Sequence, residues 1–305
     1  MPTIIIKGMN HDRQPKTASQ PNWPQPSVRP RVLILGAGDR PLVREEVAKL
    51  TLEIERHAEI VLTDLEYVQD LSQVAADFAM VFGGDGSILR AAKALGTHQV
   101  PVLGINMGKL GFLAGISPGE LLSVLPAVCA GECRLVSHLM FTVTVLRNGE
   151  PLCQHLGLNE TSILGGEPFS IIDIDLYIDA ELATSYSCDG LIISTPVGST
   201  AHSLSAGGPI LRKDVQAFVI SPISPHTLTV RPVVDTADRV YEMVVKRPNE
   251  GTTVVADGRV LCRLTGEDRV RVERAKSTFQ MIEVAGHSYY RTLREKLGWS
   301  GRIAY

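Results

Sequence analysis

A short apolar run that breaks into glycines constrains the fold of this chain more than any other feature. Residues 78–89 read FAMVFGGDGSIL, the pattern of a buried strand, a glycine-rich turn over 83–86 and the first turn of a helix. Glycine reaches backbone angles closed to other residues and lets the main chain approach a ligand. Helix N-termini attract anions through free N–H groups and the helix dipole. The stretch therefore predicts a phosphate-handling turn.

Asp85 stands inside this turn, where a negative side chain would repel phosphate. We therefore expect it to have a chemical task, such as accepting a proton or holding a magnesium ion. The alternative is a tight turn in which the Asp binds its own backbone. Ser87 is expected to cap the helix, which an apolar stripe extends to Gly96.

Strands alternate with helical stretches through the first half of the chain. We expect strands at 31–35, 58–62, 78–82 and 100–105, and helices at 42–57 and near Leu71. This alternation predicts an α/β domain with a parallel, doubly wound sheet covered by helices on both faces. Ligands of such sheets bind beyond the carboxyl ends of the strands, where the glycine turn falls.

The second half has a different pattern. After Leu135, segments such as HLMFTVTVLR and SIIDIDLYID alternate apolar and polar residues with period two, which predicts mostly antiparallel sheet. Ser117-Pro118-Gly119-Glu120 predicts a capping box that opens a helix ending near Ala130. We expect a flexible leader over 1–30, the α/β domain over 31–136, a β-rich domain over 137–287 and, over 288–305, a C-terminal helix that packs back on the first domain.

Composition and charge narrow the class of protein. Hydrophobic residues at 44% and charged residues at 21% are ordinary for a soluble globular protein, and a net charge of -3 gives no reason to expect nucleic acid or a membrane as partner. The chain shows no apolar run of membrane-spanning length and no secretory signal pattern, so we expect a cytoplasmic location. The five cysteines form no CxxC pair, which argues against a disulfide framework or a structural zinc site.

A run of hydroxyls and glycines over 189–209 is the second functional signal. It reads DGLIISTPVGSTAHSLSAGGP, an apolar strand that leads into many backbone and hydroxyl donors in little space. This composition suits ribose hydroxyls, amides and phosphates. The alternative is a helix start capped by Ser or Thr with ordinary loop chemistry.

Five blocks, in order along the chain, resemble the signature blocks of the NAD kinases. They are GGDGS at 83–87, GINMGKLGFL at 104–113, LNE at 158–160, the run at 189–209 and PISPHTLTVRP at 222–232. GGDGS alone is shared with phosphofructokinases and with lipid kinases of the diacylglycerol type, whereas the block at 195–209 is more specific. The resemblance covers nearly all of the chain from residue 31 onward.

This resemblance implies phosphorylation of the 2'-hydroxyl on the adenosine ribose of NAD to give NADP, with ATP as the expected donor. Asp85 would accept the hydroxyl proton. A divalent ion, expected to be Mg²⁺, would bridge the donor phosphates. The β-rich domain would bind the dinucleotide. The family also implies a homodimer or homotetramer, with no nucleic acid and no membrane as partner.

The resemblance also assigns substrate-binding residues. Gly84 and Ser87 would line the donor phosphates, Gly86 would let the ribose approach the backbone, and Asp189 would bind the nicotinamide end. Phe112 and Leu113 would wall the adenine, unless they only pack in the core. The other implied positions are Asn159, Glu160, Ser187, Thr200, Ala201, His202, Ser203, Leu204, Ser205 and Arg259.

Three of these positions depart from the family's pattern. His202 stands where many members have Tyr, Ser187 where many bacterial members have Arg, and Arg259 where Gln is usual. The charge of Arg259 would compensate for the Arg missing at 187 if the two positions face one groove.

Two other functions stay open at this point. One is another GGDG kinase acting on a lipid or a sugar phosphate, although the polar run at 194–208 does not suit an apolar lipid groove. The other is a non-catalytic NADP(H)-binding sensor of the same fold, against which the intact Asp85 argues.

Overall fold

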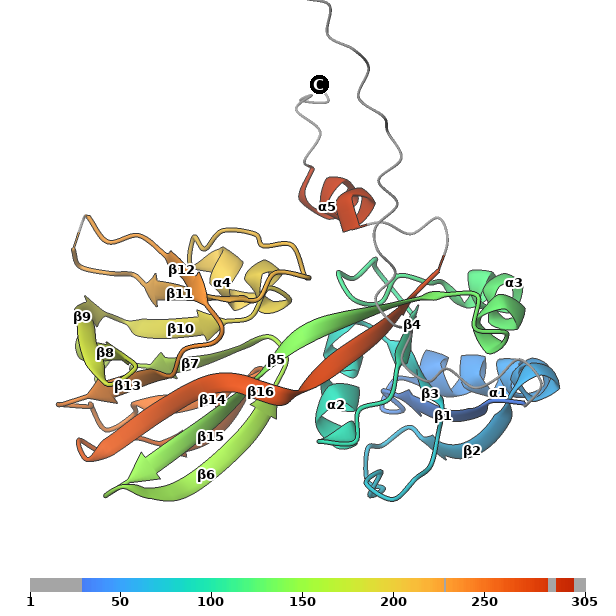
Figure 1. Ribbon diagram of the computed structural model, residues 1–305, viewed down its shortest axis with the longest axis horizontal. Helices are drawn as coiled ribbons and strands as arrows, with labels where there is room; N and C mark the ends of the chain where they lie inside the picture. Colours follow the sequence, from blue (N-terminus) through green and yellow to red (C-terminus); the bar gives the residue numbers. More distant parts are fainter. Residues whose placement is uncertain (1–28, 228, 285–288, 299–305) are drawn as a thin grey trace, which may run out of the picture.

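The computed structural model describes residues 29–227, 229–284 and 289–298, so most of the predicted leader lies outside the described residues. The first part of the chain alternates strands and helices (Figure 1). Its elements are β1 (Arg31–Gly36), α1 (Pro41–His57), β2 (Glu59–Asp64), β3 (Phe78–Gly83), α2 (Asp85–Leu95), β4 (Val102–Asn106) and α3 (Pro118–Cys129).

Helices cover both faces of the sheet that these strands form. β2, β1, β3 and β4 pair in parallel in that order, and β3 is buried along its whole length. α1 and α3 pack on one face through residues such as Val43, Ile54 and Leu125, and α2 packs on the other through Ile88 and Leu95. The predicted parallel, doubly wound α/β architecture is confirmed.

Local hydrogen bonds decide where two of the helices start. α3 opens on the predicted capping box, in which the Glu120 carboxylate accepts the Ser117 N–H at 2.8 Å. The prediction that Ser87 caps α2 is wrong, because the N-cap is Gly84 and Ser87 lies buried inside the first turn. Gly83, at φ 151°, makes room for it: a methyl group there would lie 2.0 Å from Ser87 Oγ.

The helix predicted near Leu71 is absent from the structure, where residues 65–77 form an irregular segment of bends with a turn at 72–73. Leu71 is buried as an apolar anchor, but the Asp64 carboxylate accepts the N–H groups of Glu66 and Gln69 at 3.0 and 2.8 Å. Side chains that bind nearby backbone N–H groups offer the chain an alternative to helical hydrogen bonds.

The second part is mostly antiparallel strand, as predicted. Its elements are β5 (Arg134–Arg147), β6 (Glu150–Gly157), β7 (Glu160–Leu164), β8 (Ile172–Ile178), β9 (Glu181–Cys188), β10 (Gly190–Ser194), η1 (Gly198–Thr200), α4 (His202–Ser205), β11 (Ala217–Ile223), β12 (Val233–Thr236), β13 (Tyr241–Val245), β14 (Thr253–Ala256), β15 (Arg259–Arg263) and β16 (Asp268–Glu283), followed by the helix α5 (Tyr289–Leu297).

One long strand joins the two parts. β16 pairs in parallel with β4 through Met281 and Val102, and antiparallel with β5 and β13. The larger sheet therefore has the order β2-β1-β3-β4-β16-β13-β8-β9, with β5 and β6 attached to β16, and it runs through both parts (Figure 1). The apolar pattern of the sequence did not predict this shared strand. The domain boundaries that were drawn from the sequence stay predictions.

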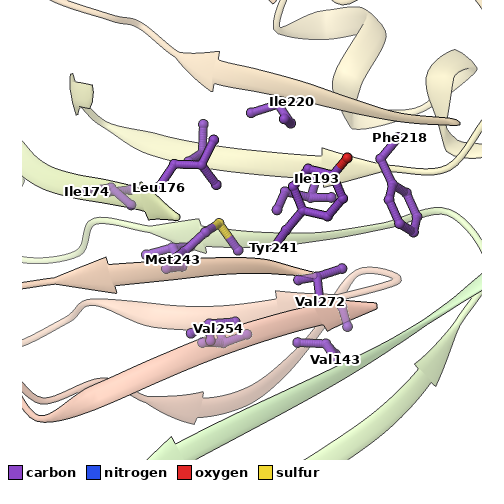
Figure 2. Packing of buried hydrophobic residues seen from close by; sticks show 14 of the residues in the cluster. Val143, Ile174, Leu176, Ile193, Phe218, Ile220, Tyr241, Met243, Val254 and Val272 are labelled. Carbon is purple, nitrogen blue, oxygen red and sulfur yellow. The ribbon is translucent and has the colours of Figure 1, made fainter. Parts of the chain in front are cut away.

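The smaller sheet, in the order β12-β11-β10-β7-β14-β15, packs face to face on the antiparallel half of the larger one. Tyr241, Met243 and Val272 from the larger sheet meet Phe218 and Ile193 from the smaller one (Figure 2). The rings of Phe218 and Tyr241 meet edge to face, with their centres 5.7 Å apart. This apolar sandwich is the packing that period-two alternation in both sheets requires.

α5 contacts both parts of the chain. The Tyr289 hydroxyl donates to the Leu211 carbonyl at 2.8 Å, and Lys296 Nζ lies 4.8 Å from the centre of the Phe112 ring. None of the helices within the described ranges has the length and apolar character needed to cross a membrane.

Replacing Tyr241 by Phe tests the polar contact inside the sandwich core. The Tyr241 hydroxyl donates to the Thr236 carbonyl at 2.6 Å. We expect Tyr241→Phe to lower the free energy of unfolding by about 1 kcal/mol, because the carbonyl loses its partner. Tyr177→Phe is the matched control, since the Tyr177 ring keeps its place 5.1 Å from the Arg269 guanidinium. Urea unfolding measures both, and equal losses in the two variants would contradict the assignment.

Candidate active site

The Asp85 carboxylate is bound to the loop that follows β4. Oδ2 accepts the Phe112 N–H at 2.8 Å, and Oδ1 accepts the N–H groups of Leu113 and Ala114 at 2.9 and 3.2 Å. The alternative in which Asp85 binds only its own turn is therefore wrong. The side chain ties the GGDGS turn to the GINMGKLGFL block, and the two follow neighbouring parallel strands.

Glycines shape both sides of this turn. A methyl group at Gly111 would lie 2.1 Å from Asp85 Oδ1, so the loop reaches the carboxylate only because this position has no side chain. Methyl groups at Gly84 and Gly86 would meet nothing within 4 Å. One side of the turn is packed against the loop, and the other is open to a ligand.

A second carboxylate holds the LNE block in the same way. Asp257 accepts the N–H groups of Leu158 and Asn159, both at 2.8 Å, and that of Glu160 at 3.2 Å. It lies between β14 and β15 at φ 46°, a conformation that Asp tolerates better than most residues. The hairpin turn thereby orients the start of β7.

Glu160 is a buried acid with an unused oxygen. Burial, and then the charge of Asp257, raise the pKa of Glu160 to about 8, while the His202 backbone N–H lowers it in part. Its Oε2 has no hydrogen-bond partner among the described residues. The carboxyl therefore holds a proton at neutral pH and can donate a hydrogen bond to a ligand oxygen.

The hydroxyl-rich run folds back onto the LNE block. Thr195 donates through its N–H to the Asn159 carbonyl at 2.9 Å and through its hydroxyl to the Leu158 carbonyl at 2.6 Å. The chain at Gly198 is so close that a methyl group there would lie 2.1 Å from the Asn159 oxygen. η1 and α4 follow directly and so lie beside this block.

Apolar side chains complete the assembly. Leu113, Leu158 and Val197 each come from a different signature block, and they share one buried cluster with Ile88, the residue directly after GGDGS. The structure therefore brings GGDGS, GINMGKLGFL, LNE and the hydroxyl-rich run to one place.

The predicted site residues differ in their access to a ligand. Gly86, His202 and Ser205 are exposed, whereas Ser87 and Ser203 are buried, and the Ser203 hydroxyl lies 3.0 Å from that of Ser221. Leu113 and Glu160 are also buried. The partly buried ones are Gly84, Asp85, Phe112, Asn159, Thr200, Ala201 and Leu204.

Ser187 and Asp189 are not brought to this place within one chain. The register pairs Ser194 with Glu160 and Gly190 with Leu164, so Asp189 precedes the far end of β10, roughly 15 Å along the strand. The Ser187 hydroxyl binds Asp173 on β8. Arg259 instead lines a groove against α2, so within one chain it does not share a groove with Ser187.

Two residues of the site were not predicted from the sequence. Lys213 is partly buried, and its ammonium donates to the Phe112 carbonyl on the loop that holds Asp85; desolvation lowers the pKa of this lysine. An Arg-Lys-Asp triplet between strands normally indicates a solvated turn, so nothing in the sequence pointed to it. For Asp257 a signal existed, because Asp-Gly between two strands is typical of a hairpin turn.

Solved structures of kinases share this fold. Yeast NADH kinase complexed with NADH has a TM-score of 0.82 at 21% identity, over 90% of this chain and 89% of that chain. An NAD kinase from Archaeoglobus fulgidus in complex with ATP has a TM-score of 0.67 at 24% identity, over 88% and 97% of the two chains. The fold of this chain is that of this class of kinases.

Relatives closer in sequence are more specific. Models of the ATP-NAD kinase N-terminal and C-terminal domains match residues 11–133 and 158–284. The NAD kinase of Rhodopirellula baltica is 55% identical over 275 residues, which are 90% of this chain and 88% of that protein. The NAD kinase of Geobacter sulfurreducens is 41% identical over 229 residues, 75% and 81% of the two chains. The chain belongs to the NAD kinase family.

Family membership decides between the functions left open by the sequence. The protein is a phosphotransferase with NAD kinase function, which excludes the lipid and sugar-phosphate kinases and the non-catalytic sensor.

Gly111→Ala tests the contact between the loop and Asp85. The added methyl group would displace the carboxylate, so we expect kcat for NADP formation to fall by about 100-fold, the cost of a misplacement near 1 Å. Gly108→Ala is the matched control in the same loop, because its methyl group would meet nothing within 4 Å. A coupled assay for NADP measures both, and similar rates in the two variants would show that the contact has no effect.

Glu160 makes the stability of the protein depend on pH. Its pKa is about 8 in the folded protein against 4.5 for a free side chain. Between these values the folded state binds the proton more tightly than the unfolded chain, so stability falls as pH rises. Over this whole difference the fall is on the order of 5 kcal/mol, from about 1.4 kcal/mol per pKa unit.

Glu160→Gln removes the carboxyl group that titrates, so the free energy of unfolding should depend less on pH in this variant. Urea unfolding of both proteins at pH 5, 6.5 and 8 measures the difference. Burial also raises the pKa of Asp257, so this residue lowers stability at higher pH in the wild type and in Glu160→Gln alike. Parallel profiles would show that Glu160 does not hold its proton.

Proposed function

We propose that this NAD kinase transfers the terminal phosphoryl group of ATP to the 2'-hydroxyl of the adenosine ribose of NAD, and that Asp85 accepts the hydroxyl proton. One observation carries this assignment: the Asp85 carboxylate is held by three backbone N–H groups beside the open glycines 84 and 86. An oriented acid next to open backbone is what a ribose hydroxyl and a phosphate chain require together.

The hydrogen bonds of Asp85 leave it capacity for this task. A carboxylate has about four acceptor positions, and the loop uses three of them. The remaining position can accept the 2'-hydroxyl. As the ribose oxygen bonds to the terminal phosphorus, its proton passes to Asp85 and the bond from phosphorus to the bridging oxygen breaks. Direct transfer needs no covalent enzyme intermediate.

The dinucleotide is assigned to the LNE block and the hydroxyl-rich run. Glu160 carries a proton that it can donate to a ribose oxygen, and Asn159 lies beside it. His202 and Ser205 are exposed on α4 and are available to the dinucleotide. Phe112, partly exposed on the loop that binds Asp85, would lie along the adenine. The role of Ser203 rests on the resemblance alone, because its hydroxyl is buried.

Magnesium is the expected metal. The described residues contain no group of three or more His, Cys, Asp or Glu side chains that could hold a metal ion. Mg²⁺ is usually bound by waters and substrate phosphates together with one or two carboxylates, and because the remaining acceptor position of Asp85 is assigned to the 2'-hydroxyl, the donor phosphates would be its main ligands beside the open turn. Bound there, the ion would neutralise charge on the donor phosphates. Gly84 would line these phosphates, whereas the role of Ser87 rests on the resemblance, since its hydroxyl is buried.

The solved relatives support both substrates. One is complexed with NADH and the other with ATP.

A homo-oligomer is part of the same proposal. β9 is an edge strand of the larger sheet and β12 is an edge strand of the smaller one, and they expose Leu182, Val233 and Val234 at 52%, 47% and 45%. Exposed apolar edge strands are surfaces on which a second chain pairs. Ser187 lies in β9 and Asp189 follows it, so in an oligomer both can reach the site of a second copy. The cytoplasmic location stays a prediction.

Asp85→Asn tests the assignment, since it keeps the shape of the side chain and removes the base. We expect kcat for NADP formation to fall by about 10²–10⁴-fold, the usual worth of a general base, with NAD binding retained. Asp70→Asn is the control, because the Asp70 carboxylate accepts the Ser72 N–H at an exposed position. The coupled assay and calorimetric titration of NAD measure the two effects. Undiminished turnover in Asp85→Asn would rule out the role of this base.

A further inference from the structure

A groove rich in basic side chains lies beside the first turns of α2. Arg90, Lys93, His155 and Arg259 line it, together with Gly86, Leu89, Asp257 and Gly258. We call the first four residues the cationic groove.

Three elements supply these side chains. Arg90 and Lys93 follow Gly86 on one face of α2, since residues three and four apart are neighbours on a helix. His155 comes from β6, and Arg259 is the first residue of β15. At about 1.5 Å per residue, the helix from Gly86 to Lys93 spans roughly 10 Å. The groove therefore begins at the open glycine next to Asp85 and leads away from it.

The cations of the groove form no salt bridge within the described ranges. Arg90, Lys93 and Arg259 form neither a salt bridge nor a side-chain hydrogen bond there, unlike Arg147, which pairs with Asp268 at 2.7 Å. Burial, and then the charge of Arg259, lower the pKa of Lys93, so the two cations lie close enough to repel each other. Like charges held together without a partner are unfavourable until an anion binds between them.

Asp257 does not cancel this charge. It is the carboxylate among the residues that line the groove, and it already accepts three backbone N–H groups. Burial raises the pKa of Asp257, and its backbone hydrogen bonds and the charge of Arg259 offset this only in part. Arg90, Lys93 and Arg259 therefore share the groove with one carboxylate, which is already hydrogen-bonded to the backbone of the LNE block.

His155 adds a group that responds to an anion. Its Nε2 is buried and has no partner among the described residues. Burial, Lys93 and Arg259 lower the pKa of His155 to about 4, so the imidazole is neutral at pH 7. An anion bound to the two cations would offset their repulsion and raise this pKa.

We propose that the cationic groove binds the phosphate chain of the donor behind the phosphoryl group that is transferred, and so sets which donors the enzyme accepts. The inference rests on the proposed function of Asp85. The ligand class is a linear chain of three or more phosphates, which a nucleoside triphosphate and inorganic polyphosphate share.

The position of the groove gives it a task in the reaction. The terminal phosphorus, next to Asp85 and Gly86, forms its bond to the ribose oxygen and loses its bond to the bridging oxygen of the next phosphate. The electron pair of the broken bond stays on that oxygen. Lys93 and Arg259 would then face the negative charge that develops on the leaving phosphates, and charge-assisted hydrogen bonds are the strong ones.

Steady-state kinetics of Lys93→Ala, Arg259→Gln and the double variant test this proposal. The donors are MgATP and magnesium polyphosphate, each at saturating NAD. We expect the KM for the donor to rise about tenfold for each lost charge-assisted contact, with the KM for NAD unchanged. Arg263→Ala is the matched control, because Arg263 lies on the same strand as Arg259 and outside the residues that line the groove. A larger effect with ATP or with polyphosphate assigns the groove to that donor.

Binding of tripolyphosphate in the absence of NAD separates this proposal from the assignment of Asp85. Calorimetry should show weaker binding to the double variant than to the wild type, and NMR of the His155 ring should show its pKa rising when tripolyphosphate binds to the wild type. If Asp85→Asn stays active, the assignment of the base fails while these measurements still report on the groove. If the double variant keeps the donor KM and the tripolyphosphate affinity of the wild type, the groove proposal is overturned.

Discussion

The site depends on the bond between one carboxylate and one loop. Asp85 begins α2, and its oxygens accept three consecutive N–H groups from the loop after β4. The neighbouring parallel strands β3 and β4 end at the same edge of the sheet, so the two connections meet there. Gly111 allows the contact, because any side chain at that position would occupy the place of the carboxylate. The acid is thereby oriented before any substrate arrives, which is how a scaffold prepares a catalytic group.

The same device recurs on the other side of the site. Asp257 accepts three consecutive N–H groups from Leu158 to Glu160, and the hydroxyl-rich run packs onto that block through Thr195. One carboxylate orders the segment assigned to proton transfer, and the other orders the segment assigned to the dinucleotide. β3 and β4 anchor the first segment in the larger sheet, and β7, β14 and β15 anchor the second in the smaller sheet, so neither part of the site stands on a free loop.

Period and local chemistry predicted much of the fold from the sequence. Alternating strands and helices indicated the parallel sheet, period-two segments indicated the antiparallel part, and Ser117 with Glu120 indicated a helix start. The pairing of strands distant in sequence was not predictable, because the period of apolar residues indicates which face of a strand is buried and not which strand lies beside it. The pairing of β16 with β4, β5 and β13 is an example. The signature blocks named Asp85 and Glu160 as site residues, but the burial of Ser87 and the placement of Asp189 at the far end of β10 depend on packing and register.

A double-mutant cycle on kcat between Asp85→Asn and Gly111→Ala tests the central claim most directly. If Gly111 matters only because it lets the loop hold the Asp85 carboxylate, then Gly111→Ala should slow the wild type by about 100-fold and change the rate of the Asp85→Asn enzyme by no more than about threefold. If the two losses multiply instead, the loop acts independently of the carboxylate, and the account of an acid oriented by its backbone contacts is contradicted.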